Sequence, residues 1–149
     1  MRLVHGNILD VSQGILVHGV NMQGKFNAGL AKQIRQRYPQ VYQDYLRAYE
    51  RGLRLGDVIF TRVSATLIIA SGVTQVYYGR EPSVVYVNYR AVGEVFYQVA
   101  SMARMTGLPV VHPAIGCGLA GGSWQEIEPL ITQALHGLPE STLYVHDDP

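Results

Sequence analysis

Short apolar runs alternate with longer amphipathic stretches along the whole chain. Runs such as Ile15–Val20 have the length of buried strands, whereas stretches such as Tyr89–Thr106 repeat apolar residues at helical spacing. The strands that this pattern predicts are Arg2–His5, Ile15–Val20, Asp57–Val63, Leu67–Val73, Pro109–His112 and Thr142–His146. The predicted helices are Ala28–Tyr38, Gln40–Gly52, Tyr89–Thr106 and Ser123–Leu135. Strands that alternate with helices indicate an α/β fold, in which crossover helices cover a mostly parallel sheet.

Proline, glycine and a capping pattern set the expected helix ends. Pro39 divides one long helical stretch into two, because proline lacks the N–H group and disfavours helical geometry in the residue before it. Gly107 followed by Pro109 is typical of a helix C-terminus. Ser123 with Glu126 three residues later matches a capping box, which predicts that the Ser123 side chain caps the last helix.

Two glycine-rich loops follow apolar strands and are the most informative feature of the sequence. The first, NMQGKFNAG, runs from Asn21 to Gly29, and the second, IGCGLAGG, runs from Ile115 to Gly122. Each precedes a predicted helix, so each can present backbone N–H groups and a positive helix end to an anion. We expect the two loops to meet at one edge of the sheet, where they would suit a diphosphate with sugar-like groups on either side.

The composition of the 149-residue chain is that of a globular protein, with 48% hydrophobic and 15% charged residues. We expect one domain over residues 1–149. A single cysteine excludes an intramolecular disulfide, and the first ten residues lack the apolar core of a signal peptide, so we expect a cytoplasmic protein that is not attached to a membrane. The sequence predicts neither a metal site nor a cofactor.

The net charge of +1 argues against nucleic-acid binding driven mainly by electrostatics. Basic residues are nevertheless concentrated in one part of the chain. Seven of the twelve lie there, at Lys25, Lys32, Arg35, Arg37, Arg47, Arg51 and Arg54. An RNA-binding face is one explanation. We favour solvated outer faces of two helices, because no nucleic-acid motif accompanies these residues.

The segment Gly116-x-Gly118-x-x-Gly121 matches the dinucleotide fingerprint of Rossmann folds in form only. That fingerprint belongs to the first strand–helix turn and is followed by further strand–helix units. Here only one predicted helix and one predicted strand follow it. The loop therefore fits phosphate binding but not a Rossmann architecture.

Four segments resemble the macrodomain family of ADP-ribose-binding modules. They are GNIL near the start, ILVHGVNMQGKFNAGLAKQI, IASGVTQVYYGREPSVVYVNY and HPAIGCGLAGGSWQEI. The resemblance covers nearly the whole chain and implies a three-layer α/β/α fold, with about six strands in a mixed, mostly parallel sheet and helices on both faces. It is strongest with a small single-domain branch that includes the yeast ADP-ribose 1''-phosphate phosphatase and related bacterial and phage proteins.

The resemblance also implies ligand-binding roles. Asn7 and Ile8 correspond to the family's adenine-side turn, where an acidic residue often accepts from the adenine amino group; the Asn7 amide oxygen could accept without the charge. The first loop would approach the distal ribose and part of the diphosphate, and the second would wrap the diphosphate. Gly24 and Gly29 would let the backbone approach the ligand. The implied ligand-binding residues are Asn7, Ile8, Asn21, Gly24, Asn27, Ala28, Gly29, Gln75, Tyr78, Arg80, Ile115, Gly116, Cys117, Gly118, Leu119, Ala120 and Gly121.

His18 is the residue to which the resemblance assigns chemistry, because the phosphatase-like branch carries a histidine at the matching place. An imidazole could protonate a leaving ribose oxygen or activate water near neutral pH. A buried core histidine is the alternative. Cys117 lacks the arginine that a cysteine phosphatase would need after it, so we expect it to fill space beneath the second loop.

Two positions depart from other macrodomain enzymes. Enzymes that release ADP-ribose from carboxylate side chains or DNA bases use a lysine after the fourth strand, and the former also use an aspartate in the second loop. Gln75 and Ala120 occupy these places here, and neither can supply that chemistry. Arg80 could instead pair with a terminal 1''-phosphate.

The sequence therefore predicts an ADP-ribose-binding macrodomain that hydrolyses ADP-ribose 1''-phosphate to ADP-ribose and phosphate. A binding module for ADP-ribose or an ADP-ribosylated macromolecule, without turnover, is the main alternative. A de-ADP-ribosylating hydrolase with an unusual active site is another, and an RNA-binding domain is less favoured. The expected partners are thus ADP-ribose or its 1''-phosphate, with neither a membrane nor, in the favoured readings, free nucleic acid.

Overall fold

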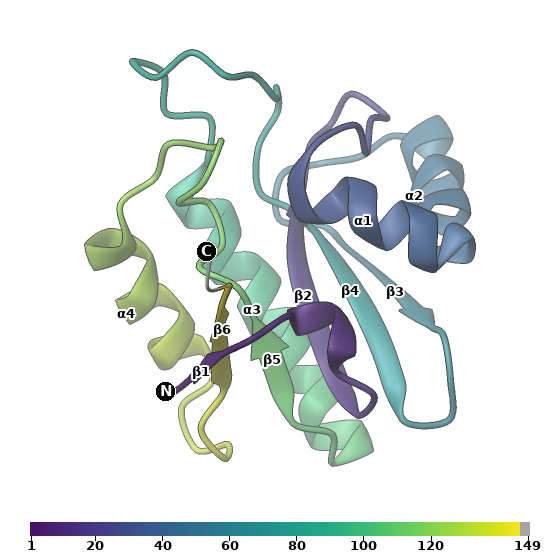
Figure 1. Cartoon of the computed structure of the whole chain (residues 1–149), viewed down its shortest axis with the longest axis vertical. Helices are drawn as coiled ribbons and strands as arrows, with labels where there is room; N and C mark the ends of the chain where they lie inside the picture. The colour runs from purple at the N-terminus through teal and green to yellow at the C-terminus, as the bar shows by residue number, and fades with distance from the viewer. Residues whose placement is uncertain (147–149) are drawn as a thin grey trace.

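The computed structural model describes residues 1–146 and arranges them in three layers (Figure 1). Its sheet has the strand order β1-β6-β5-β2-β4-β3, and every neighbouring pair is parallel except β3 with β4. The strands are β1 (Arg2–His5), β2 (Gly14–Val20), β3 (Val58–Arg62), β4 (Leu67–Val73), β5 (Val110–His112) and β6 (Thr142–Val145). The α-helices are α1 (Gly29–Arg37), α2 (Pro39–Arg51), α3 (Tyr89–Thr106) and α4 (Trp124–Ala134), and a short 3₁₀ helix, η1, spans Ile8–Asp10.

The central strand β2 divides the core into two halves. Ile15 and Val17 face the layer of α3 and α4, while Leu16 and Val20 face the layer of α1 and α2. Alternate side chains of a strand point to opposite faces, so a strand covered on both sides is apolar at almost every position. This explains the continuous run of buried residues in β2, and Figure 1 shows one helix pair on each side of the sheet.

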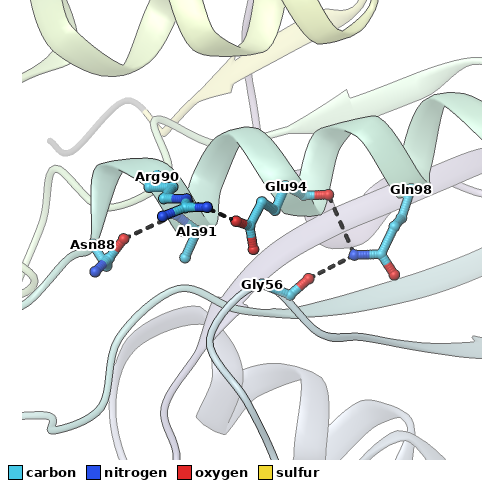
Figure 2. Close-up of polar contacts among 6 residues, drawn as sticks. All are labelled: Gly56, Asn88, Arg90, Ala91, Glu94 and Gln98. Carbon is cyan, nitrogen blue, oxygen red and sulfur yellow. Dashed lines mark hydrogen bonds and ion pairs between the residues drawn. The ribbon is translucent and has the colours of Figure 1, made fainter.

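Figure 2 shows the polar contacts that cap helix α3 and join its middle to the backbone just before β3. The Asn88 side chain accepts from the Ala91 N–H at 2.9 Å, which caps the helix. Farther along, Gln98 Nε2 donates to the Gly56 carbonyl at 2.6 Å, and the exposed Arg90 pairs with Glu94 one turn later. These contacts stabilise the N-terminus of α3 and fix its position next to the backbone before β3.

The predicted fold class and the six strands and four α-helices are confirmed within residues 1–146, with ends that differ by at most one residue. Pro39 separates α1 from α2, and Gly107 ends α3 in the left-handed conformation, as expected. The capping box was wrong: Ser123 precedes α4, but its side chain caps no N–H group there. The helix η1 was not predicted, because a single turn leaves no hydrophobic period. No helix in the described part of the chain is long and apolar enough to cross a membrane.

Candidate functional site

A cavity of about 500 Å³ lies where the two glycine loops meet. The loops follow β2 and β5, which are adjacent parallel strands, so their carboxyl ends lie at the same edge of the sheet. The expectation that the loops converge is therefore confirmed. Of the residues predicted for the site, those that line this cavity are His18, Asn21, Asn27, Ala28, Gly29, Gln75, Tyr78, Arg80, Ile115, Gly116, Gly118, Leu119 and Ala120.

The N-terminus of α1 opens into this cavity. Gly29 begins the helix with a φ of +59°, a conformation that favours glycine, and the preceding Ala28 has no side-chain cap. The first N–H to find a partner along the helix is that of Lys32, which donates to the Ala28 carbonyl at 3.3 Å. Within the described chain, the N–H groups of Gly29, Leu30 and Ala31 are thus left without a partner. Such N–H groups, together with the helix dipole, can bind an anion.

The second loop supplies further donors. Its ends are closed by a hydrogen bond from the Gly122 N–H to the Gly116 carbonyl, at 2.6 Å. The N–H groups of Gly118, Leu119 and Ala120 donate to no other group in residues 1–146. The helix after this loop does not contribute as expected, because α4 begins at Trp124 and its first residues do not line the cavity. The loop can therefore bind an anion through its own amides, without that helix dipole.

The segment between β4 and α3 holds the second loop in place. The N–H groups of Tyr86 and Val87 both donate to the Ala120 carbonyl, at 2.7 and 3.2 Å. Gly116 has a φ of +79°, and a Cβ there would lie 2.7 Å from the Val87 side chain. Close packing of the two segments thus requires glycine at this position.

His18 lies at the floor of the cavity and is only 1% exposed. It is on the same face of β2 as Leu16 and Val20, and its ring packs edge-on against Phe26 at 5.6 Å. Its Nε2 is hydrogen-bonded to the Ser71 hydroxyl at 2.7 Å, whereas Nδ1 is buried and has no partner among the described residues. Burial lowers the pKa of His18 to about 3, so the ring is neutral at pH 7.

Two tyrosines of α2 support the first loop from below. The buried Tyr45 hydroxyl donates to the Asn21 carbonyl at 2.6 Å and accepts from the Gly24 N–H at 3.0 Å. Tyr42 donates to the Gly24 carbonyl at 2.7 Å. The Asn21 side chain closes the loop by donating to the Lys25 carbonyl at 2.8 Å. The loop conformation is therefore held by Asn21, which lines the cavity, and by two tyrosines that do not.

Three residues predicted to bind ligand do not line either of the cavities at this edge of the sheet. A Cβ on Gly24 would contact the Tyr49 ring, so this glycine permits packing on α2. Gly121, with a φ of +74°, lies against the Val84 carbonyl. Cys117 packs against the core beneath the loop, and burial raises its thiol pKa, which fits the expected filler role.

A second cavity, of about 360 Å³, adjoins the first. Asn7 and Ile8 line it, and it shares Gly29, Leu30 and Pro113 with the larger cavity. Its other lining residues are Gly6, Gln33, Tyr144 and His146. The two cavities thus lie side by side at the N-terminus of α1.

The larger cavity contains cationic side chains. Lys25 and Arg80 line it, and no aspartate or glutamate is among its described lining residues. Residues 1–146 also contain no cluster of three metal-ligating side chains. Sequence reasoning missed Lys25 and Thr74, although the first lies inside a glycine loop and the second directly follows β4. It also missed Gln33, which comes one turn after Gly29 on α1 and so faces the same side.

No family model matches the chain. A DNA ADP-ribosyl glycohydrolase of Thermus aquaticus is 26% identical over 99% of this chain and 41% of its own length. A macrodomain protein from Streptomyces coelicolor has a structure with a TM-score of 0.81 and 29% identity, covering 98% of this chain and 99% of that one. Thermosipho africanus DarTG, solved in complex with ADP-ribose, gives a TM-score of 0.79 at 20% identity, covering 97% of this chain and 41% of that one.

The chain thus spans about two fifths of the length of the curated relative. The matches do not single out the phosphatase branch. They do support the macrodomain family for this chain, whose three-layer α/β/α architecture is the macrodomain fold.

Proposed function

We propose that this chain binds ADP-ribose across the two adjoining cavities. The adenosine would occupy the smaller cavity beside Asn7 and Ile8, and the distal ribose would enter the larger one near Gln75. The diphosphate would lie between them, at the N-terminus of α1 and the second glycine loop. One observation carries this proposal: two sets of backbone N–H groups without partners converge on one cavity that has no carboxylate in its lining.

Hydrolysis at the distal ribose is a second candidate function. Lys25 and Arg80 favour substrates that carry an additional anionic group there, which includes ADP-ribose 1''-phosphate. The phosphatase mechanism predicted from the sequence needs His18 to transfer a proton. Burial keeps its ring neutral at pH 7 and makes it a weak base, so it is poorly suited both to protonating a leaving oxygen and to activating water, and the site supports binding better than this mechanism.

A glycohydrolase acting on ADP-ribosylated DNA is favoured by the name of the Thermus aquaticus relative. Gln75 lines the cavity at the place where the resemblance implies a lysine, and the lysine that lines the cavity here is Lys25 in the first loop. If the chain carries out this reaction, Lys25→Ala should abolish it, whereas Lys32→Ala, on the outer part of α1, should not.

Calorimetry with ADP-ribose tests the binding proposal, with Gly118→Val as the decisive variant. Gly118 lines the cavity, and a Cβ there would meet no atom within 4 Å, so a larger side chain can be added without a clash in the protein, and we expect it to obstruct the bound diphosphate. We expect affinity to fall at least about tenfold while Tm is unchanged. Gly93→Ala, inside α3, is the matched control and should leave binding intact. Failure of the wild-type protein to bind ADP-ribose at millimolar concentration would refute the proposal.

The same samples separate the candidate activities. Incubation with ADP-ribose 1''-phosphate, followed by phosphorus NMR, detects phosphatase turnover. Incubation with an ADP-ribosylated oligonucleotide, followed by chromatography, detects glycohydrolase turnover. Binding with neither product would identify a binding module.

A further inference from the structure

The sheet ends in two edge strands that differ in their charges. Strand β1 lies at one end of the strand order and β3 at the other, so each is hydrogen-bonded to a neighbouring strand on one side only (Figure 1). Charged residues, proline or a covering segment usually protect such edges, because a further strand can add to them. Strand β1, RLVH, begins with arginine and ends with histidine, whereas β3, VIFTR, is uncharged up to its last residue. The edge of β3 is therefore the less protected one.

The main chain of β3 presents a row of unpaired groups at this edge. In an antiparallel pair, only alternate residues of a strand are hydrogen-bonded to the neighbouring strand. The Val63 N–H donates to the Leu67 carbonyl, and the register then places the bonds to β4 at Thr61 and Ile59. Three residues of β3 therefore direct their N–H and C=O groups away from the sheet. With no partner for these groups within residues 1–146, they are Val58, Phe60 and Arg62.

There is space for another chain beside this edge. A hollow of about 410 Å³ lies there, lined by Val58, Ile59 and Phe60 of β3. Its other walls come from the end of α2 and from Gln98 of α3, so it opens between the two helical layers. The three strand residues are apolar but only half-buried. An added chain would therefore cover apolar surface as well as satisfy the outward-facing main chain.

We propose that a second copy of this chain pairs with β3, antiparallel, around a two-fold axis at Phe60. An extended polypeptide is the kind of partner that offers main-chain donors and acceptors at the spacing of a strand. In this register Val58 of one copy lies opposite Arg62 of the other, and the outward-facing residues form about six main-chain hydrogen bonds. The two Phe60 side chains lie opposite each other on the α3 face, as an aromatic cross-strand pair.

The charges of the strand favour this partner. Arg62 is the one charged residue of β3 and lies at its end, so the two-fold arrangement separates the two arginines by about 14 Å along the strands. Each arginine lies instead near Asp57 of the other copy, which directly precedes β3. One Asp57 oxygen accepts from the Arg54 N–H at 2.8 Å, and the other has no partner in the described chain. Arg62 uses Nη1 for the Ala65 carbonyl, at 2.9 Å, which leaves other N–H groups for the carboxylate.

This pairing is separate from the proposed ligand site. The hollow beside β3 and the cavity between the glycine loops share none of their described lining residues. Two six-stranded sheets are joined at β3, while both cavities stay open at the opposite part of each sheet. We therefore expect monomer and dimer to bind ADP-ribose equally well.

Sedimentation velocity of the intact chain tests the pairing. Between about 5 and about 500 µM, the wild-type protein should change from monomer to dimer, with a dissociation constant in the micromolar range. Arg62→Pro removes an outward-facing N–H and the guanidinium group but no bond to β4, and edge strands tolerate proline at such positions. This variant should weaken the dimer at least about tenfold and leave the affinity for ADP-ribose unchanged.

Two lysine variants make the test independent of the proline. Val58→Lys places a charge in the middle of the interface and should also weaken the dimer at least about tenfold. Leu3→Lys, on β1 and at a position that is 55% exposed, is the matched control and should leave the dimer intact. Thermal unfolding of each variant verifies that it is folded.

Three results would overturn the pairing. The first is a wild-type protein that stays monomeric at about 500 µM, which would leave the edge to a strand of another protein. The second is a dimer that neither Arg62→Pro nor Val58→Lys weakens. The third is a dimer that Leu3→Lys dissociates, since it would then form through β1. Failure to bind ADP-ribose would refute the proposed function without affecting this inference.

Discussion

The two glycine loops are built differently, although they meet at one cavity. The first is supported from outside, by the hydroxyl groups of Tyr42 and Tyr45 on α2. The second is closed largely by its own backbone and by the main chain of the segment before α3. Side-chain substitutions on α2 should therefore disturb the first loop, whereas the second depends on glycine and on backbone geometry.

The strands before the loops carry a buried histidine each, and these also differ. In β5, His112 Nδ1 donates to the Pro113 carbonyl at 2.8 Å and Nε2 accepts from the Ser141 hydroxyl at 2.9 Å. In β2, His18 is bonded only through Nε2, to Ser71. Both ring nitrogens of His112 are thus hydrogen-bonded, one of them to Ser141 just before β6, whereas Nδ1 of His18 has no partner among the described residues.

The largest effect we expect is a loss of stability in mild acid. Burial lowers the pKa of His18 to about 3 and that of His112 to about 4, from an ordinary value of 6.5. Below pH 6.5 the unfolded chain binds protons that the folded chain excludes, so the free energy of unfolding decreases as pH falls and is level above about pH 7.5. At pH 5 the two histidines together should cost about 4 kcal/mol relative to pH 8.

Urea unfolding measured from pH 8 to pH 5 checks this effect. Replacing either histidine by leucine should remove about half of the slope. An unfolding free energy that stays level across this range would show that the buried rings do not control acid stability.

The next largest effect we expect is a difference at pH 8 between the stability costs of replacing His112 and of replacing His18. His112→Leu leaves the Ser141 hydroxyl and the Pro113 carbonyl without partners, and should destabilise the protein by about 3 kcal/mol. His18→Leu loses one bond to Ser71 but also removes a buried nitrogen that has no partner, so its cost should be at most about 1 kcal/mol. Thermal and urea unfolding of both variants give the comparison. Equal losses of unfolding free energy in the two variants would contradict the view that His112 in β5 is better hydrogen-bonded than His18 in β2.

The smallest effect concerns support of the first loop. Tyr45→Phe keeps the ring but removes the hydroxyl that joins Asn21 to Gly24, and should cost about 1 to 2 kcal/mol. We also expect weaker ADP-ribose binding, because Asn21 lines the cavity. Tyr49→Phe, on the next turn of α2 and 40% exposed, is the matched control and should change neither quantity. Loss of stability with unaltered affinity would mean that Tyr45 supports the core but not the site.

The sequence predicted the elements well because β2 and β4 are apolar throughout and the helices keep a clear period. The meeting of the loops followed from their position after parallel strands. Side-chain direction was harder to predict. The role of Gly24 depends on Tyr49, which lies on another element, and the Ser123 side chain makes no capping hydrogen bond although the sequence pattern predicts one. The burial of His18 depends on Phe26 and on the register that pairs it with Ser71.

The set of residues that line the smaller cavity also could not be predicted from sequence patterns. Gln33 and Tyr144 lie far apart in the chain and join Asn7 only once α1 and β6 have packed on the sheet. A pattern along the sequence cannot show such a group of residues. The resemblance could place Asn7 there, because it compares whole chains and not local periods.

The donors that converge on the larger cavity belong to peptide bonds, which every residue except proline carries. Substitution along these loops can therefore reshape what the cavity admits at its sugar and base ends while the anion-binding groups stay in place. If the cavity binds a diphosphate as proposed, such a division would let the ends of the ligand vary while the same backbone groups bind the phosphates.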